Sequence, residues 1–200
     1  VPDPFGHVGQ LPAILKGAGL DSFIFTRGAG PWIQEAGGVF NWYASDGRSK
    51  VLAIQQVPDY PCLMAWGFEN RPLDRKDSLN IDVDTAMGRV ERLMDKHEAL
   101  GWKPDVLLFG QGSDHTHPQP TLPFLIGKAN SKFNGRIRFQ HSSFPAYIEA
   151  LKGWLGSKKI FRFQGELHSG WDRNILSGVF SARLHLKRAN DHAMRLMRDQ

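Results

Sequence analysis

The stretch PDPFGHVGQLPAILKGAGLDSFIFTR, residues 2–27, predicts an extended segment, a short helix and then a strand. The proline that follows Asp3 pushes this residue into extended geometry, and Gly6 permits a sharp turn. Residues 8–19 carry apolar side chains at helical spacing and end in glycine, and residues 22–26 form a compact apolar strand. A carboxylate held by a stiff backbone is well suited to a catalytic role. Most Asp residues in loops, however, serve turns and helix caps, so both interpretations of Asp3 stay open.

Strand-like and helix-like segments alternate along the rest of the chain. Residues 39–57 predict a hairpin that turns at Asp46 and Gly47. The further strands expected are 105–110, 136–141 and 159–167, and the further helices are 83–100, 121–130, 144–155 and 181–199. This alternation predicts an α/β fold, a partial irregular (β/α) barrel with mainly parallel strands and outer helices. In such a barrel the strands 22–26, 105–110 and 136–140 would lie parallel and adjacent or nearly so, with helix 83–100 packed outside them by its apolar stripe of Met87, Leu93 and Met94.

Composition excludes several classes of function. The 200 residues carry a net charge of +5, but Lys and Arg are scattered except in the last helix, so no nucleic-acid partner is expected. No apolar run approaches the roughly eighteen residues of a membrane span, so no membrane partner is expected either. The single cysteine, Cys62, cannot form an intramolecular disulfide, and it fits a small buried residue in a reducing compartment such as the cytosol.

Two carboxylates stand where a parallel α/β fold places functional groups, at the carboxyl ends of strands. Asp114 lies in the loop GQGSDHTH that follows strand 105–110, and Arg27 follows strand 22–26. Together with Asp3, Asp114 gives a pair of acids, which is the minimal machinery of glycoside hydrolysis.

Each of these residues also has a structural interpretation. Asp114 could cap its own loop, and Arg27 could be a structural partner of a carboxylate. His115 and His117 form a His-x-His pair that can ligate a metal, but so short a match fits surface histidines better. No Ser–His–Asp signature, P-loop or Rossmann glycine pattern is present. The residues alone therefore indicate an α/β barrel enzyme with carboxylates at its strand ends.

Four motifs in collinear order resemble the catalytic domain of the retaining α-mannosidases of glycoside hydrolase family 38. An Asp-x-Phe-Gly-His stretch is followed by a Gln-x-Pro-x-Leu helix and a strand that ends in Arg. The other three are the aromatic-rich hairpin VFNWYASDGRSKVLAIQ, the segment LLFGQGSDHTHPQPTLPFLI and the segment FQGELHSGW…LSGVFSARLHLKRAN. The resemblance covers nearly the whole chain.

The resemblance implies a barrel of the family 38 type and a role for each candidate residue. Asp3 would be the catalytic nucleophile and also a zinc ligand, and Asp114 would be the general acid/base. Phe5 would stack on the sugar, Arg27 would hold the nucleophile side of the pocket, and Tyr60 would offer its phenol to the substrate. The implied reaction is hydrolysis of terminal α-mannosidic bonds in a mannose-containing oligosaccharide by double displacement.

The zinc site implied by the family is incomplete in this sequence. The family takes its other ligands from a His-x-Asp motif upstream of Asp3 and from a histidine beyond the last helix. Residues 1–180 are thus expected to form part of the barrel without its first strands, and residues 181–200 a long helix that leads toward a helical domain outside this sequence. Two alternatives stay open: a metal-dependent polysaccharide deacetylase, although its His-x-x-x-His spacing is absent, and a non-catalytic carbohydrate-binding remnant.

Overall fold

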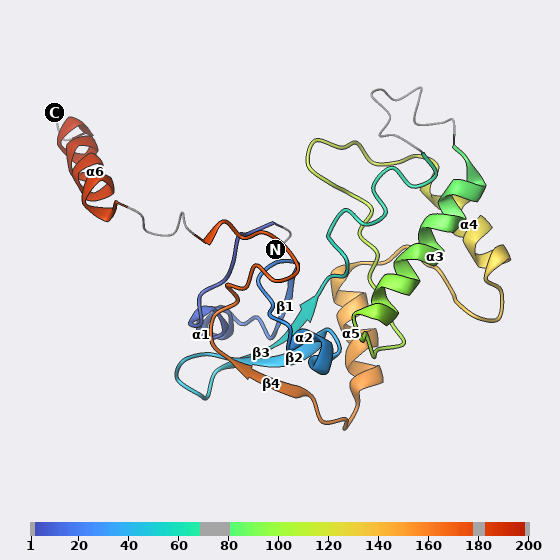
Figure 1. Cartoon of the computed structure of the whole chain (residues 1–200), viewed down its shortest axis with the longest axis horizontal. Coiled ribbons are helices and arrows are strands. Elements are labelled where there is room, and N and C mark those ends of the chain that lie inside the picture. Colours follow the sequence, from blue (N-terminus) through green and yellow to red (C-terminus); the bar gives the residue numbers. More distant parts are fainter. Residues whose placement is uncertain (1–2, 69–80, 178–182, 199–200) are drawn as a thin grey trace.

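The computed structural model describes residues 3–68, 81–177 and 183–198 (Figure 1). Its strands are β1 (Ser22–Phe25), β2 (Val39–Tyr43), β3 (Lys50–Gln55) and β4 (Phe161–Gln164). Its helices are α1 (Leu11–Gly17), α2 (Ile33–Ala36), α3 (Val83–Ala99), α4 (Leu122–Lys132), α5 (Phe144–Leu155) and α6 (Leu184–Arg198). The predicted α/β class is therefore confirmed.

The four strands form one sheet in the order β1-β3-β2-β4. The pairs β1–β3 and β2–β4 are parallel, and the β2–β3 hairpin is antiparallel. The hairpin turns where it was predicted, because the Asp46 carboxylate accepts hydrogen bonds from the backbone N–H groups of Arg48 and Ser49 at 2.8 and 2.9 Å. Gly47 occupies the left-handed position of this turn, with φ at 66°.

The parallel pair β1–β3 decides where functional loops meet. Phe25 at the end of β1 lies opposite Gln55 at the end of β3. The chain therefore leaves both strands at the same edge of the sheet, and it carries Arg27 from one strand and Tyr60 from the other. This is the edge at which parallel α/β folds gather their active-site loops.

Apolar side chains cover both faces of the sheet. One face buries an aromatic cluster that includes Phe25, Phe40 and Trp42, each fully buried. The other face packs Ile54 and its neighbours against α5 through Leu151. Trp42 thus belongs to the core.

A separate apolar cluster joins α3 to α4, which lie side by side away from the sheet in Figure 1. Met87 and Leu93 of α3 are buried in it, as the predicted apolar stripe requires, and so is Trp66. Asp82 caps α3 by accepting hydrogen bonds from the backbone N–H groups of Asp84 and Thr85. Ser143 caps α5 by accepting a hydrogen bond from the backbone N–H of Ala146.

The strands predicted at 105–110 and 136–140 are wrong. Both segments partly bury apolar side chains against the core clusters, but within the described residues their backbones have no strand partner. At Phe139 the N–H and the C=O bond instead to the side chain of Asn130, at 2.7 and 2.9 Å. The neighbours Leu108 and Phe109 pack into different clusters, on the α5 side and the α3 side. The apolar runs thus correctly indicated packing against the core, although the side chains are only partly buried. Strand pairing depends on a neighbouring backbone that such a run does not specify.

The last predicted helix is confirmed as α6 over its described residues, and residues 181–182 and 199–200 lie outside them. The division of the chain near residue 180 stays a prediction. None of the helices in the described ranges has the length and apolar character to cross a membrane.

Candidate active site

The first part of the candidate site is the Asp3–Arg27 pair at the carboxyl end of β1. The Arg27 Nε donates to the Asp3 Oδ1 at 2.6 Å, and the side chains are 19% and 34% exposed, respectively. The Arg27 guanidinium carbon lies 4.7 Å from the centre of the Phe5 ring. The structure therefore brings together three of the predicted site residues, and one guanidinium orients both the acid and the aromatic ring.

Close backbone packing fixes the position of Arg27. Gly28 has φ at 105°, and a Cβ at this position would overlap the backbone carbonyl of Leu167. Ser169 N–H donates to the Gly28 carbonyl at 3.0 Å. The second donor of Arg27, Nη1, reaches the carbonyl of Asn174 at 2.9 Å. The chain beyond β4 thus lies directly against the segment that presents Arg27.

The second part of the site is the Tyr60–Asp114 pair. The Tyr60 hydroxyl donates to the Asp114 Oδ2 at 3.2 Å. The turn around Asp114 is closed by Thr116, whose hydroxyl accepts from the Ser113 N–H at 2.9 Å and donates to the Ser113 carbonyl at 2.6 Å. Asp114 is exposed and lies in this turn, and its carboxylate contacts Tyr60.

A close contact between backbones joins the loop of Asp114 to the loop of Tyr60. The Gly110 carbonyl accepts from the Leu63 N–H at 2.7 Å, and the Gly110 N–H donates to the Cys62 Sγ at 3.2 Å. A Cβ on Gly110 would overlap the carbonyl oxygen of Tyr60. Glycine is therefore required at position 110 for these two loops to approach each other.

The pKa of Tyr60 reflects charges from both pairs. Burial, the hydrogen bond to Asp114, and the negative charges of Asp3, Asp114 and Asp59 together hold the pKa of Tyr60 above its ordinary value. The Asp3 charge thus acts on the same hydroxyl that Asp114 binds. The two pairs are carried by loops that leave β1 and β3 at the same edge of the sheet.

Sequence reasoning missed four polar residues at this edge, namely Gln55, Asp59, Asp172 and Arg173. The Gln55 Nε2 donates to the Asp172 Oδ2 at 2.7 Å, and burial raises the pKa of Asp172. The Arg173 Nη1 bonds to the Asp59 Oδ2, and its Nη2 bonds to the Pro58 carbonyl. The one signal in the sequence was the run Asp-Arg-Asn at 172–174, in the loop after strand β4. This signal was misleading, because β4 ends at the opposite edge of the sheet from β1 and β3.

Asp3 is the one predicted metal ligand in this chain. Among the residues that the structure describes, no group of three His, Cys, Asp or Glu side chains could hold a metal ion. A four-coordinate zinc site needs more donors than Asp3 alone provides. The residues described here therefore do not form a closed zinc site by themselves.

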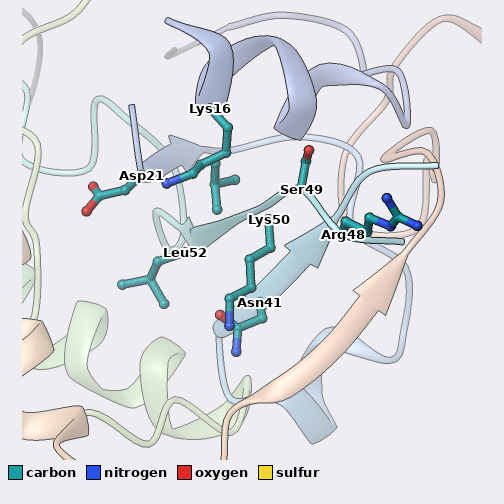
Figure 2. A pocket seen from close by; sticks show the side chains of 8 residues that line it. Lys16, Asp21, Asn41, Arg48, Ser49, Lys50 and Leu52 are labelled. Carbon is teal, nitrogen blue, oxygen red and sulfur yellow. The ribbon is translucent and has the colours of Figure 1, made fainter. Parts of the chain in front are cut away.

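A pocket of about 490 Å³ lies at the other edge of the sheet, at the amino ends of β1 and β3. Figure 2 shows Lys16, Asp21, Arg48 and Lys50 around it. It contains none of the predicted site residues. In a parallel pair the loops that carry chemistry follow the strands rather than precede them, so we place the site at the carboxyl edge.

Comparison with known proteins agrees with this arrangement. Residues 1–166 match the sequence profile of the family described as "Glycosyl hydrolases family 38 N-terminal domain". The chain belongs to glycosyl hydrolase family 38. This family membership does not favour the polysaccharide deacetylase alternative.

Two known proteins are similar to this chain, one in sequence and one in fold. The chain is 31% identical, over 98% of its length, to a protein of Halalkalibacterium halodurans (strain C-125) named "Putative mannosylglycerate hydrolase". It is similar in fold to a solved structure titled as an alpha-mannosidase from Enterococcus faecalis V583, with a TM-score of 0.66 and 24% identity over 84% of the chain. The chain spans 21% of the first protein and 17% of the second.

Proposed function

We propose that the complete protein containing this sequence is a retaining α-mannosidase that hydrolyses terminal α-mannosidic bonds of mannose-containing oligosaccharides. The observation that carries the proposal is that two acids are each held by a neighbouring side chain at the same edge of the sheet: Asp3 by Arg27, which follows β1, and Asp114 by Tyr60, which follows β3. Membership of family 38 supports glycoside hydrolysis as the reaction.

In the proposed mechanism Asp3 is the nucleophile. Its Oδ1 is engaged by Arg27, so attack on the anomeric carbon would come from Oδ2. Attack forms a covalent glycosyl ester while Asp114 gives its proton to the leaving oxygen. Asp114 then takes a proton from water, which hydrolyses the ester with a second inversion.

The other residues of the site bind and orient the substrate. The exposed Phe5 ring, held beside Arg27, offers an apolar face on which a sugar ring can stack. The Tyr60 hydroxyl donates a hydrogen bond to Asp114 in the free protein, so its phenol would exchange partners when a sugar hydroxyl or the leaving oxygen enters.

We also propose a zinc ion in the complete protein, with Asp3 as the ligand that this chain provides. The support is the resemblance to the family alone. A metal there would orient sugar hydroxyls as a template and Lewis acid. Because Asp3 is one donor, no step of the mechanism above depends on a metal.

A second candidate substrate is mannosylglycerate. It is favoured by the name of the 31% identical relative, which is similar to the chain along nearly its whole length. Both candidates share the α-mannosyl group and differ in the leaving group. Comparing kcat/KM for mannosylglycerate and for an α-linked mannobiose would decide between them.

The test of the mechanism uses two aryl α-mannosides, one with a good and one with a poor leaving group. Asp3→Ala should abolish turnover of both and weaken zinc binding. Asp114→Ala should retain zinc and slow the poor substrate by about 10²- to 10⁴-fold, with a far smaller effect on cleavage of the activated one, because only a poor leaving group needs protonation. Asp105→Ala, an exposed acid in the segment leading to Asp114, is the matched control and should keep wild-type rates. A neutral Asp114→Ala on the poor substrate would refute the acid/base assignment.

A further inference from the structure

Residues 171–175, here called the strap, cross the carboxyl edge of the sheet beside the candidate site. Before the strap, Ser169 is bound to the Gly28 carbonyl at 3.0 Å. At the strap's far end Ile175 is 2% exposed and so anchors the segment in the protein. The strap is thus held at both ends independently of its central side chains.

Three consecutive residues of the strap reach three different points of the site. Asp172 accepts from the side chain of Gln55 at the end of β3. The Asn174 carbonyl accepts from Arg27, which holds Asp3. Between them, Arg173 reaches the loop that follows β3.

Both terminal nitrogens of Arg173 bind groups of that loop. Nη1 pairs with the Asp59 Oδ2, and Nη2 donates to the Pro58 carbonyl. The other oxygen of the same carboxylate, Asp59 Oδ1, accepts from the backbone N–H of Tyr60 at 2.9 Å. Both side chains of the ion pair are mostly buried, at 22% and 24% exposed, so the pair is not simply a solvated surface contact.

These contacts form one continuous polar chain between the two acids. On one side it runs from Asp114 through Tyr60 and Asp59 to Arg173, and on the other from the strap carbonyl at 174 through Arg27 to Asp3. We infer that Arg173 is a positioning residue that holds Tyr60, and through it Asp114, in register with Asp3. A guanidinium suits this role because its planar fork binds two acceptors at once and fixes their relative position.

The inference rests on the proposed function, and it predicts a leaving-group signature. Arg173→Ala frees the Asp59 carboxylate and the Tyr60 backbone, so Asp114 loses its fixed place as proton donor. The strap keeps its anchors at Ser169 and Ile175, so the Asn174 contact to Arg27 is retained. The rate with a poor leaving group should therefore fall far more than the rate with a good one.

The experiment measures kcat and KM of the complete protein on 2,4-dinitrophenyl and methyl α-mannosides. Arg173→Ala should lower kcat/KM, which reports the formation of the glycosyl ester, by about 10- to 100-fold for the methyl glycoside and by only a few fold for the activated substrate. Arg173→Lys, which can reach one of the two acceptors, should recover part of the loss. Arg162→Ala, which removes an arginine stacked on Tyr43 of the neighbouring strand, is the matched control and should leave both rates unchanged.

A double variant tests whether Arg173 acts through Tyr60. Tyr60→Phe should show the same leaving-group signature, and adding Arg173→Ala to it should change the ratio of the two rates no further. Equal losses for both substrates, as misfolding would cause, or fully additive losses in the double variant would overturn the positioning role. A wild-type protein that cleaves neither mannoside would instead overturn the proposed function and this inference together.

Discussion

Gly110→Ala tests the contact that joins the two loops of the site. Ordinary van der Waals contact begins near 3.4 Å, and the new Cβ would lie 2.5 Å from the Gln56 Nε2 and 3.0 Å from the carbonyl carbon of Tyr60, whose oxygen it would overlap. The Gln56 side chain can rotate, but a backbone carbonyl cannot give way alone. One of the two loops must therefore move by about 1 Å, which strains the Leu63–Gly110 hydrogen bond and shifts Asp114 relative to Tyr60.

A displacement of about 1 Å typically lowers the rate of an enzymatic reaction by about 10²-fold, and overpacking of this kind costs about 1–3 kcal/mol of stability. We expect Gly110→Ala to reduce kcat/KM on a poor α-mannoside by about that factor in protein that is still folded, as checked by its melting temperature.

Gly112→Ala is the matched control for this experiment. It lies in the same loop, and a Cβ there meets no atom within 4 Å, so wild-type activity is expected. If the two alanine variants were equally active, the close approach of the loops would not determine the position of Asp114, and this part of the account would be refuted.

Three further predictions concern stability and reactivity. Asp82→Ala removes the acceptor for the N–H groups of Asp84 and Thr85 at the start of α3, so chemical unfolding should show a loss of about 1 kcal/mol, and an unchanged midpoint would contradict this. Burial raises the pKa of the Cys62 thiol to about 11, so a disulfide reagent at pH 8 should label it only after unfolding, and rapid labelling of the native protein would contradict its burial. Burial also lowers the pKa of two histidines, His7 (to about 4) and His97, from the ordinary 6.5. The unfolded chain then binds protons more readily than the folded one, so the melting temperature should fall as pH drops from about 6.5 toward 4. Replacing both histidines by Gln should flatten this pH dependence of the melting temperature. An unchanged slope in that variant would contradict the prediction.

The sequence predicted local features of the fold better than strand pairing. The hairpin turn at Asp46 and the caps Asp82 and Ser143 depend on side chains that bond to backbone groups two or three residues away. Such contacts are readable from a short window. The segments 105–110 and 136–140 show the limit. Their apolar side chains pack against the core, partly buried, while their backbone partners are decided by distant parts of the chain.

The site shows the same division between local and distant information. Strand-end placement selected Arg27, and the structure places it on Asp3. The role of Arg173 could not be read in the same way, because it depends on contacts 114 and 115 residues away in sequence, to Asp59 and Pro58. The same long-range folding brings the Tyr60 hydroxyl to Asp114, 54 residues away.

The most direct test of the central claim is to identify the carboxylate that attacks the sugar. A 5-fluoro-mannosyl fluoride forms a glycosyl-enzyme ester that accumulates, since the fluorine slows its hydrolysis more than its formation, and peptide mass spectrometry then locates the ester. We predict a single mannosyl label on Asp3, with a label that persists in Asp114→Ala and disappears in Asp3→Ala. A label on any other residue, or turnover with inversion and no label, would contradict the account.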